Sequence, residues 1–196
     1  MEVLRKMKNN TFKEYIQPVV VLVAICLVIT FALAYVNSVT SPIIAENAAK
    51  AADASRAELL PAAKTFEKYD GDLVVAVPDK VFVTECYVAD GVGMVVTVQS
   101  ASFGGLLTEM IGIDSEGSIT GVKVTAHGDT KGLGTKAHES GYLKQYQGLA
   151  ELAGAENIKG DSAVSYISGA TISSNGVYQG VCVALEQYEA VQGGAN

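Results

Sequence analysis

Residues 106–126 read LLTEMIGIDSEGSITGVKVTA, and their pattern is the clearest indication of the architecture of this chain. It holds two runs rich in β-branched and apolar residues, 106–114 and 118–126, on either side of the polar turn Asp114-Ser115-Glu116-Gly117. Two such runs at this spacing are typical of antiparallel strands joined in a hairpin. We therefore expect the chain to fold around an antiparallel sheet.

The flanking sequence extends this sheet and adds helices. Further runs of the same kind occupy residues 73–77, 81–88 and 93–99, and residues 163–167 predict one more strand. Apolar residues at helical spacing predict helices over 142–152 and 175–191. The order helix, sheet, helix, strand, helix indicates an α+β domain with a mainly antiparallel sheet and flanking helices.

A candidate membrane segment precedes the domain. Residues 18–36, PVVVLVAICLVITFALAYV, contain no charge, and a helix of that length spans on the order of 28 Å, enough to cross a bilayer core. The pattern Ala32-Leu33-Ala34 leaves a cleaved signal peptide as an alternative. Because the apolar run is long for a signal peptide, we expect a retained anchor.

The flanks of this segment predict its orientation. Basic residues precede it, namely Arg5, Lys6, Lys8 and Lys13. By the positive-inside tendency, residues 1–17 lie in the cytoplasm and the rest of the chain lies on the outer side of the membrane, periplasmic or extracellular. We expect an Ala-rich helical connector over 37–64 and the extracytoplasmic domain over 65–196.

Charge and cysteines limit the function classes. Of 14 basic and 21 acidic residues, 4 basic and 2 acidic ones precede the apolar run, which leaves 10 against 19 after it, a net charge of −9. Such a body is a poor partner for nucleic acid. Cys86 and Cys182 are the cysteines beyond the apolar run, and one disulfide or two buried thiols are both open. We expect no metal site, since no cysteine and histidine cluster supports one.

The segment SGATISSNG, residues 168–176, is the main candidate for a binding site in this sequence. It joins the last predicted strand to the last helix, and the first amides of a helix attract anions. Gly169 and Ala170 leave the backbone uncovered. The hydroxyls of Ser168, Thr171, Ser173 and Ser174 can bind phosphate oxygens or cap the helix. A phosphate site and a serine-rich cap without a ligand are both consistent with this composition.

This segment resembles a known motif. S-G-A-T-x-[ST] is similar to the flavinylation motif D-x-x-[ST]-G-A-T of the FMN-binding domain family, which includes the G subunit of the Rnf complex and the C subunit of the sodium-pumping NADH:quinone oxidoreductase. The resemblance implies that Thr171 carries FMN through a phosphoester bond made by a separate flavin transferase. Ser165 stands where the motif has Asp.

Two upstream stretches resemble the same family, most closely the Rnf G subunit. Ser102-Phe103-Gly104-Gly105 is similar to a GYGG-like turn, and HGDTKGLG, residues 127–134, is similar to the loop H-x-E-T-P-G-L-G. Asp129 replaces Glu and Lys131 replaces Pro. The resemblance implies that Gly104 and Gly105 help to bind the cofactor, that Leu133 packs on the isoalloxazine face, and that Asp129 and Thr130 bond its edge.

The function implied is that of an electron relay. By resemblance, the chain is a membrane-anchored subunit of an ion-translocating oxidoreductase complex that moves electrons between ferredoxin and NAD. Its partners would be the other subunits, of the Rnf A, B, C, D and E types. No substrate is turned over by this chain alone.

Several alternatives accompany this interpretation. Within the same class, the chain could be the C subunit of the sodium-pumping enzyme. From another class, it could be an anchored, non-redox domain that binds a phosphate ligand reversibly. A metal site at His127 and His138 lacks a fixed set of ligands, and a hydrolytic Ser168 or Ser173 lacks the G-x-S-x-G order.

Overall fold

The computed structural model describes residues 15–154 and 157–193. Its contacts divide the chain into two compact units that meet between Ala51 and Ala52. The basic residues on which the predicted orientation depends lie outside the described residues. Each unit is described by itself.

The first unit contains most of helix α2, Gln17–Leu59. This helix includes the predicted membrane segment, and it is long and apolar enough to cross a bilayer. It runs through Pro42 without a break, so the predicted connector continues the same helix to Leu59, two residues before Pro61. Within residues 15–154 and 157–193, α2 is the one helix that is long and apolar enough to cross a membrane.

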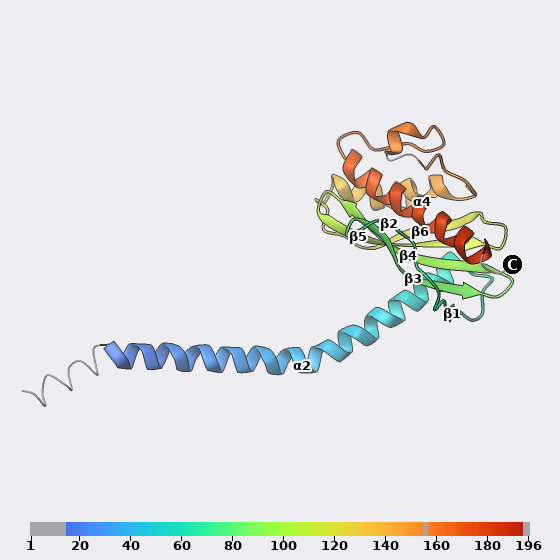
Figure 1. The fold of residues 1–196 in the computed structure, drawn as a ribbon. Coiled ribbons are helices and arrows are strands. Elements are labelled where there is room, and N and C mark those ends of the chain that lie inside the picture. Colours follow the sequence, from blue (N-terminus) through green and yellow to red (C-terminus); the bar gives the residue numbers. More distant parts are fainter. Residues whose placement is uncertain (1–14, 155–156, 194–196) are drawn as a thin grey trace, which may run out of the picture. The chain divides into compact units, whose positions relative to one another are not determined.

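The second unit is built on one sheet with antiparallel pairing in the order β1-β3-β4-β5-β6, and β2 also pairs with β3 (Figure 1). The predicted antiparallel sheet is confirmed, and the predicted hairpin is β5 and β6. The strands are β1 Glu67–Lys68, β2 Val75–Val77, β3 Val81–Ala89, β4 Gly93–Ser102, β5 Gly105–Asp114 and β6 Ile119–Ala126.

The predicted strand at 163–167 is wrong, because side chains take the backbone bonds that a neighbouring strand would supply. Ser165 N–H donates to Gln145 Oε1 at 2.8 Å, and its carbonyl accepts from Tyr142 Oη at 2.8 Å. Ile167 N–H donates to Ser174 Oγ at 3.1 Å. The segment is therefore an irregular connection to the last helix.

The predicted helix at 142–152 is mostly wrong as well. Between β6 and the last helix, the described residues form only short helical turns. Gly148, at φ 80°, ends the turn, and its N–H donates to the carbonyl of Ile119 at 2.8 Å. The turns are η2 Gly134–His138, α3 Ser140–Leu143, η3 Lys144–Tyr146 and η4 Ile158–Gly160.

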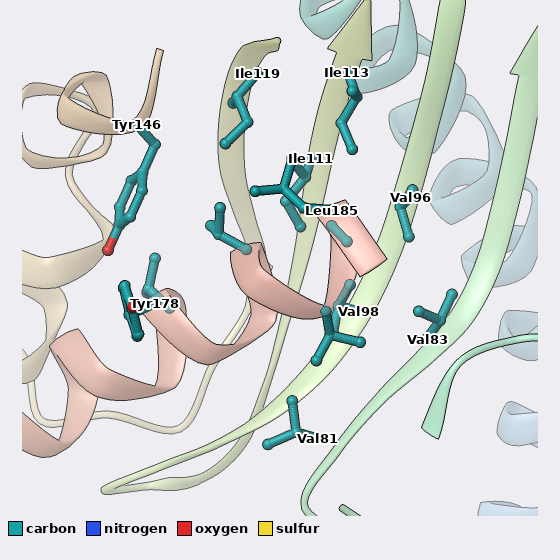
Figure 2. Close-up of a cluster of buried hydrophobic side chains, with 14 of the residues drawn as sticks. Val81, Val83, Val96, Val98, Ile111, Ile113, Ile119, Tyr146, Tyr178 and Leu185 are labelled. Carbon is teal, nitrogen blue, oxygen red and sulfur yellow. The ribbon is translucent and has the colours of Figure 1, made fainter. Parts of the chain in front are cut away.

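Helix α4, Thr171–Gly193, covers one face of the sheet (Figure 1). It begins four residues earlier than the apolar spacing predicted, so Thr171 lies inside it. The predicted apolar face is buried at Val177, Val181 and Leu185. These side chains join one core with residues from the strands, including Val98 and Ile111 (Figure 2). Burial of this face holds the start of α4 in place against the sheet.

The C-terminal end of α2, within the second unit, packs on the sheet through a second cluster. Leu59 and Leu60 are buried with Val95 and Met110. The carbonyl of Leu59 accepts a hydrogen bond from Thr120 Oγ1 at 2.5 Å. Residues after Ala51 are thus part of the domain.

Candidate functional site

The SGAT motif lies on a tight turn that enters α4. Ala170 N–H donates to the carbonyl of Ile167 at 3.0 Å, and the Ala170 carbonyl accepts from Ser174 N–H at 2.9 Å. Gly169 has a φ of 83°, in the left-handed region that favours glycine. The second residue of the motif is therefore fixed by the geometry of the turn.

This turn leaves three helix amides free of intrahelical acceptors. Because Ser174 donates to Ala170, the amides of Thr171, Ile172 and Ser173 precede the first bond of the helix. Such amides carry the partial positive charge of the helix dipole. The start of α4 thus favours an anionic group such as a phosphate.

A pocket of about 270 Å³ opens beside these amides. Its walls come from the β4–β5 turn, from the loop after β6 and from the start of α4, and its lining is mostly apolar. The lining residues are Phe103, Thr130, Leu133, Gly134, Gly169, Ala170, Thr171, Ile172 and Ser173. An apolar slot beside a helix start that favours anions is compatible with a molecule that has a flat apolar ring and an anionic tail.

The loop and the motif meet inside this pocket. A Cβ at Gly169 would lie 3.7 Å from Leu133 Cδ1, so the leucine side chain passes over the glycine. Leu133 is nevertheless 47% exposed, and it is not a plug in the core. Gly132, at φ 78°, turns the loop, and Lys131 is exposed.

Asp129 does not line the pocket. Its side chain is 0% exposed. Its Oδ2 accepts from Ser102 Oγ at 2.5 Å, and its Oδ1 accepts from Gly104 N–H at 2.6 Å. Burial raises the pKa of Asp129, but the hydrogen bonds from Ser102, Gly104 and Ser173 outweigh burial, so its pKa is lowered.

The glycines at the β4–β5 turn, Gly104 and Gly105, are exposed and do not line the pocket. A Cβ at Gly104 would come 2.1 Å from the carbonyl carbon of Gly128, which explains why the turn and the loop need glycine where they touch. Gly105, at φ 108°, has nothing within 4 Å of such an atom. Gly104 thus allows a close backbone approach, and Gly105 allows the turn.

The remaining serines of the motif differ in position. Ser173 lines the pocket and is buried. Ser174 is also buried, and its Oγ accepts from Ile167 N–H. Ser168 is exposed and lies outside the lining. Of the predicted binding residues, the pocket therefore brings together Thr130, Leu133, Gly169, Ala170, Thr171 and Ser173.

The two histidines lie near Asp129. The ring centroids of His127 and His138 are 4.5 Å apart, and His138 Nε2 is 3.1 Å from Asp129 Oδ2. Burial and the nearby His127 lower the pKa of His138, against the raising effect of Asp129. Across residues 15–154 and 157–193, no group of three His, Cys, Asp or Glu side chains is arranged to hold a metal. Cys86 and Cys182 are free thiols.

Sequence reasoning missed two large apolar side chains in the lining, Phe103 and Ile172. Phe103 is 68% exposed in a two-residue turn, and Ile172 is 57% exposed directly after Thr171. A large apolar side chain in a glycine turn, or off the buried face of a helix, is the signal that could have found them.

Comparison with known proteins identifies a matching domain and similar proteins. Residues 103–186 match the model of the FMN-binding domain. The chain is 29% identical over 188 residues to the G subunit of the Na(+)-translocating ferredoxin:NAD(+) oxidoreductase complex of Acetobacterium woodii, covering 86% of this chain and 89% of the relative. It is 26% identical over 174 residues to the G subunit of the proton-translocating ferredoxin:NAD(+) oxidoreductase complex of Clostridium ljungdahlii, with the same coverage.

A third relative matches over a shorter stretch. The G subunit of the ion-translocating oxidoreductase complex of Stutzerimonas stutzeri is 33% identical over 95 residues, 45% of this chain and 42% of that protein. Residues 103–186 hold every residue that lines the pocket. Residues 103–186 therefore match the FMN-binding domain, and the similarity of the chain to G subunits of ion-translocating oxidoreductase complexes extends over most of its length.

Proposed function

We propose that this chain is a membrane-anchored electron-relay subunit that carries FMN through a phosphoester bond to Thr171. The observation that carries the proposal is the position of Thr171, which is the first residue of α4 and lines the pocket. Its hydroxyl stands at the helix amides that favour a phosphate. The family match supports FMN as the ligand.

The residues of the pocket fit this cofactor. The amides of Thr171, Ile172 and Ser173 would hold the phosphate. The exposed side chains of Phe103, Leu133 and Ile172 provide apolar surface for the isoalloxazine ring. Thr130 lies where it can bond a polar edge of the ring.

The bond to Thr171 would join its Oγ1 to the phosphorus of FMN as the hydroxyl loses its proton and a P–O bond of an activated FMN donor, an FMN phosphoanhydride, breaks and releases the rest of that donor, so the chain gains one FMN less one water. A separate flavin transferase makes this bond. The linkage leaves the ring electronically unchanged, and bound FMN supplies reversible transfer of electrons. The chain's own part is to hold the ring at the pocket and to prevent its diffusion.

The anchor limits where the relay can operate. Helix α2 contains the apolar segment, and the basic residues before it favour a cytoplasmic N-terminus. The FMN domain then lies on the outer side of the membrane. A fixed anchor keeps the cofactor within reach of redox centres in neighbouring subunits.

The partners follow from the relatives. All three relatives are G subunits, and two are named for ferredoxin and NAD(+), which favours an Rnf-type complex with A, B, C, D and E subunits over the C subunit of the sodium pump. One relative is named for Na(+) and another for protons, so the relatives themselves differ in their coupling ion.

The test is in-gel flavin fluorescence of the denatured full-length chain, made in cells with and without a flavin transferase. The proposal expects a fluorescent band only with the transferase. A dark band in both samples, with FMN that binds and dialyses away, would instead support the reversible phosphate-binding domain.

A further inference from the structure

Asp129 occupies an unexpected place for a residue of a ligand-binding loop. Its neighbour Thr130 lines the pocket, as does Leu133, yet the Asp129 side chain is 0% exposed. A buried carboxylate is costly unless donors surround it. The groups that donate hydrogen bonds to the Asp129 carboxylate therefore indicate its role.

Two donors lie at the β4–β5 turn, one at the end of β4 and one in the turn itself. Ser102 Oγ lies 2.5 Å from Oδ2, and Gly104 N–H lies 2.6 Å from Oδ1. These residues stand on either side of Phe103, which forms one wall of the pocket. The carboxylate thus holds the residue before Phe103 and the residue after it.

Other contacts come from the opposite wall. Asp129 accepts a hydrogen bond from the side chain of Ser173, in the first turn of α4. A Cβ at Gly134 would lie 2.8 Å from Ser173 Oγ and 2.9 Å from Asp129 Cβ, so a glycine is needed for this approach. His138 also lies beside the carboxylate, with its Nε2 3.1 Å from Asp129 Oδ2.

We propose that Asp129 is a positioning residue that holds the walls of the pocket together from behind and does not contact the flavin ring. The role rests on the proposed function only for the identity of the ligand. Charge-assisted hydrogen bonds are short and strong, and a carboxylate can bind several donors at once. One side chain thereby sets the distance between Phe103 and the start of α4.

The chain offers a matched control in Asp161. This carboxylate is also buried, and it accepts from Ala153 N–H at 2.8 Å, Ala163 N–H at 2.8 Å and Tyr178 Oη at 2.9 Å. Asp161 is not part of the pocket lining. Replacing either carboxylate removes a comparable set of hydrogen bonds, but only Asp129 spans the pocket walls.

The experiment compares Asp129→Asn with Asp161→Asn in the full-length chain. We expect both to lower the Tm by on the order of 5 °C. Asp129→Asn alone should shift the absorption bands of the attached flavin, and Asp129→Glu should restore them at least in part, because a carboxylate is kept. Equal flavin spectra in Asp129→Asn and the wild type would overturn the proposal.

A second readout needs no flavin. The chain has no Trp, so Phe103→Trp introduces a single reporter on the turn. In flavin-free protein, Asp129→Asn should increase quenching of this reporter by acrylamide, and Asp161→Asn should not. If Asp129→Asn does not fold, Ser102→Ala removes one donor and should give the same change to a smaller degree.

The two failures are distinguishable. A wild-type chain without covalent flavin defeats the proposed function, and the tryptophan reporter still decides the role of Asp129. A wild-type chain with flavin, but with a reporter equally quenched in both Asn variants, defeats the positioning role alone.

Discussion

Leu133 Cδ1 lies 3.7 Å from the place that a Cβ at Gly169 would occupy, so the loop after β6 and the turn before α4 share one surface. The two residues are 36 positions apart in the sequence. This contact joins the two halves of the pocket, and it depends on a glycine with a φ of 83°.

Gly169→Ala should therefore disturb the turn. The substitution forces an L side chain into the left-handed region, which costs roughly 1–2 kcal/mol, and flavin incorporation should fall because Thr171 moves with the turn. Gly141→Ala is the control, since nothing lies within 4 Å of its new Cβ. Denaturant unfolding and flavin content measure both effects, and an unchanged flavin content in Gly169→Ala would contradict this view of the turn.

Thr171→Ala should abolish covalent flavin and leave the fold intact. The change removes a half-buried hydroxyl at a helix start, so the free energy of unfolding should alter by no more than about 1 kcal/mol. Thr171→Ser keeps the hydroxyl and should retain some flavin. Ser168→Ala, an exposed serine outside the lining, should retain all of it.

Leu133→Ala should keep the phosphoester and change the surroundings of the ring. Because the side chain is 47% exposed, the stability loss should stay below about 1 kcal/mol. Leu106→Ala is a matched control at 45% exposure, outside the lining. A flavin absorption spectrum that shifts in Leu106→Ala as much as in Leu133→Ala would contradict the role of Leu133.

Glu109 predicts a pH dependence of stability. Its side chain is fully buried under α4, against Gly180, and burial raises its pKa well above the usual value. The folded chain therefore keeps a proton that the unfolded chain loses near pH ~4.3. Below that pH Glu109 is protonated in both the folded and the unfolded chain, and the free energy of unfolding is at its highest with respect to this group. As the pH rises from there towards the folded pKa, the free energy of unfolding decreases.

Glu109→Gln should remove that part of the decrease. Denaturant unfolding at pH 5 and pH 8 measures it, with Glu116→Gln, an exposed carboxylate in the β5–β6 turn, as the control. The Glu109 variant should lose less stability between the two pH values than the wild type. If the wild type and Glu109→Gln lose the same amount of stability between pH 5 and pH 8, Glu109 is already ionised in the folded chain.

Local patterns predicted most of the sheet. The run lengths and the turn at Asp114 to Gly117 identified β5 and β6 almost to the residue, because hairpin pairing is local. The bonds that replace a strand at 163–167 come from Gln145 and Ser174, which lie outside that segment. No periodicity in the segment itself carries that information.

The site was predictable in part for the same reason. Thr171, Leu133 and Thr130 were predicted from short sequence motifs, and such motifs can be identified without knowing how the chain packs. The burial of Asp129 depends on Ser102 and Gly104, 27 and 25 residues earlier. The exposure of Phe103 depends on where the β4–β5 turn ends against the loop.

The attachment of FMN to Thr171 can be tested by locating the modification by mass. No Lys or Arg follows Lys159, so a tryptic digest of the chain made with a flavin transferase places residues 168–176 in the peptide that starts at Gly160. Fragmentation of this peptide should put a gain of one FMN less one water on Thr171. The unmodified mass for this peptide, or the gain on another residue, would contradict the account.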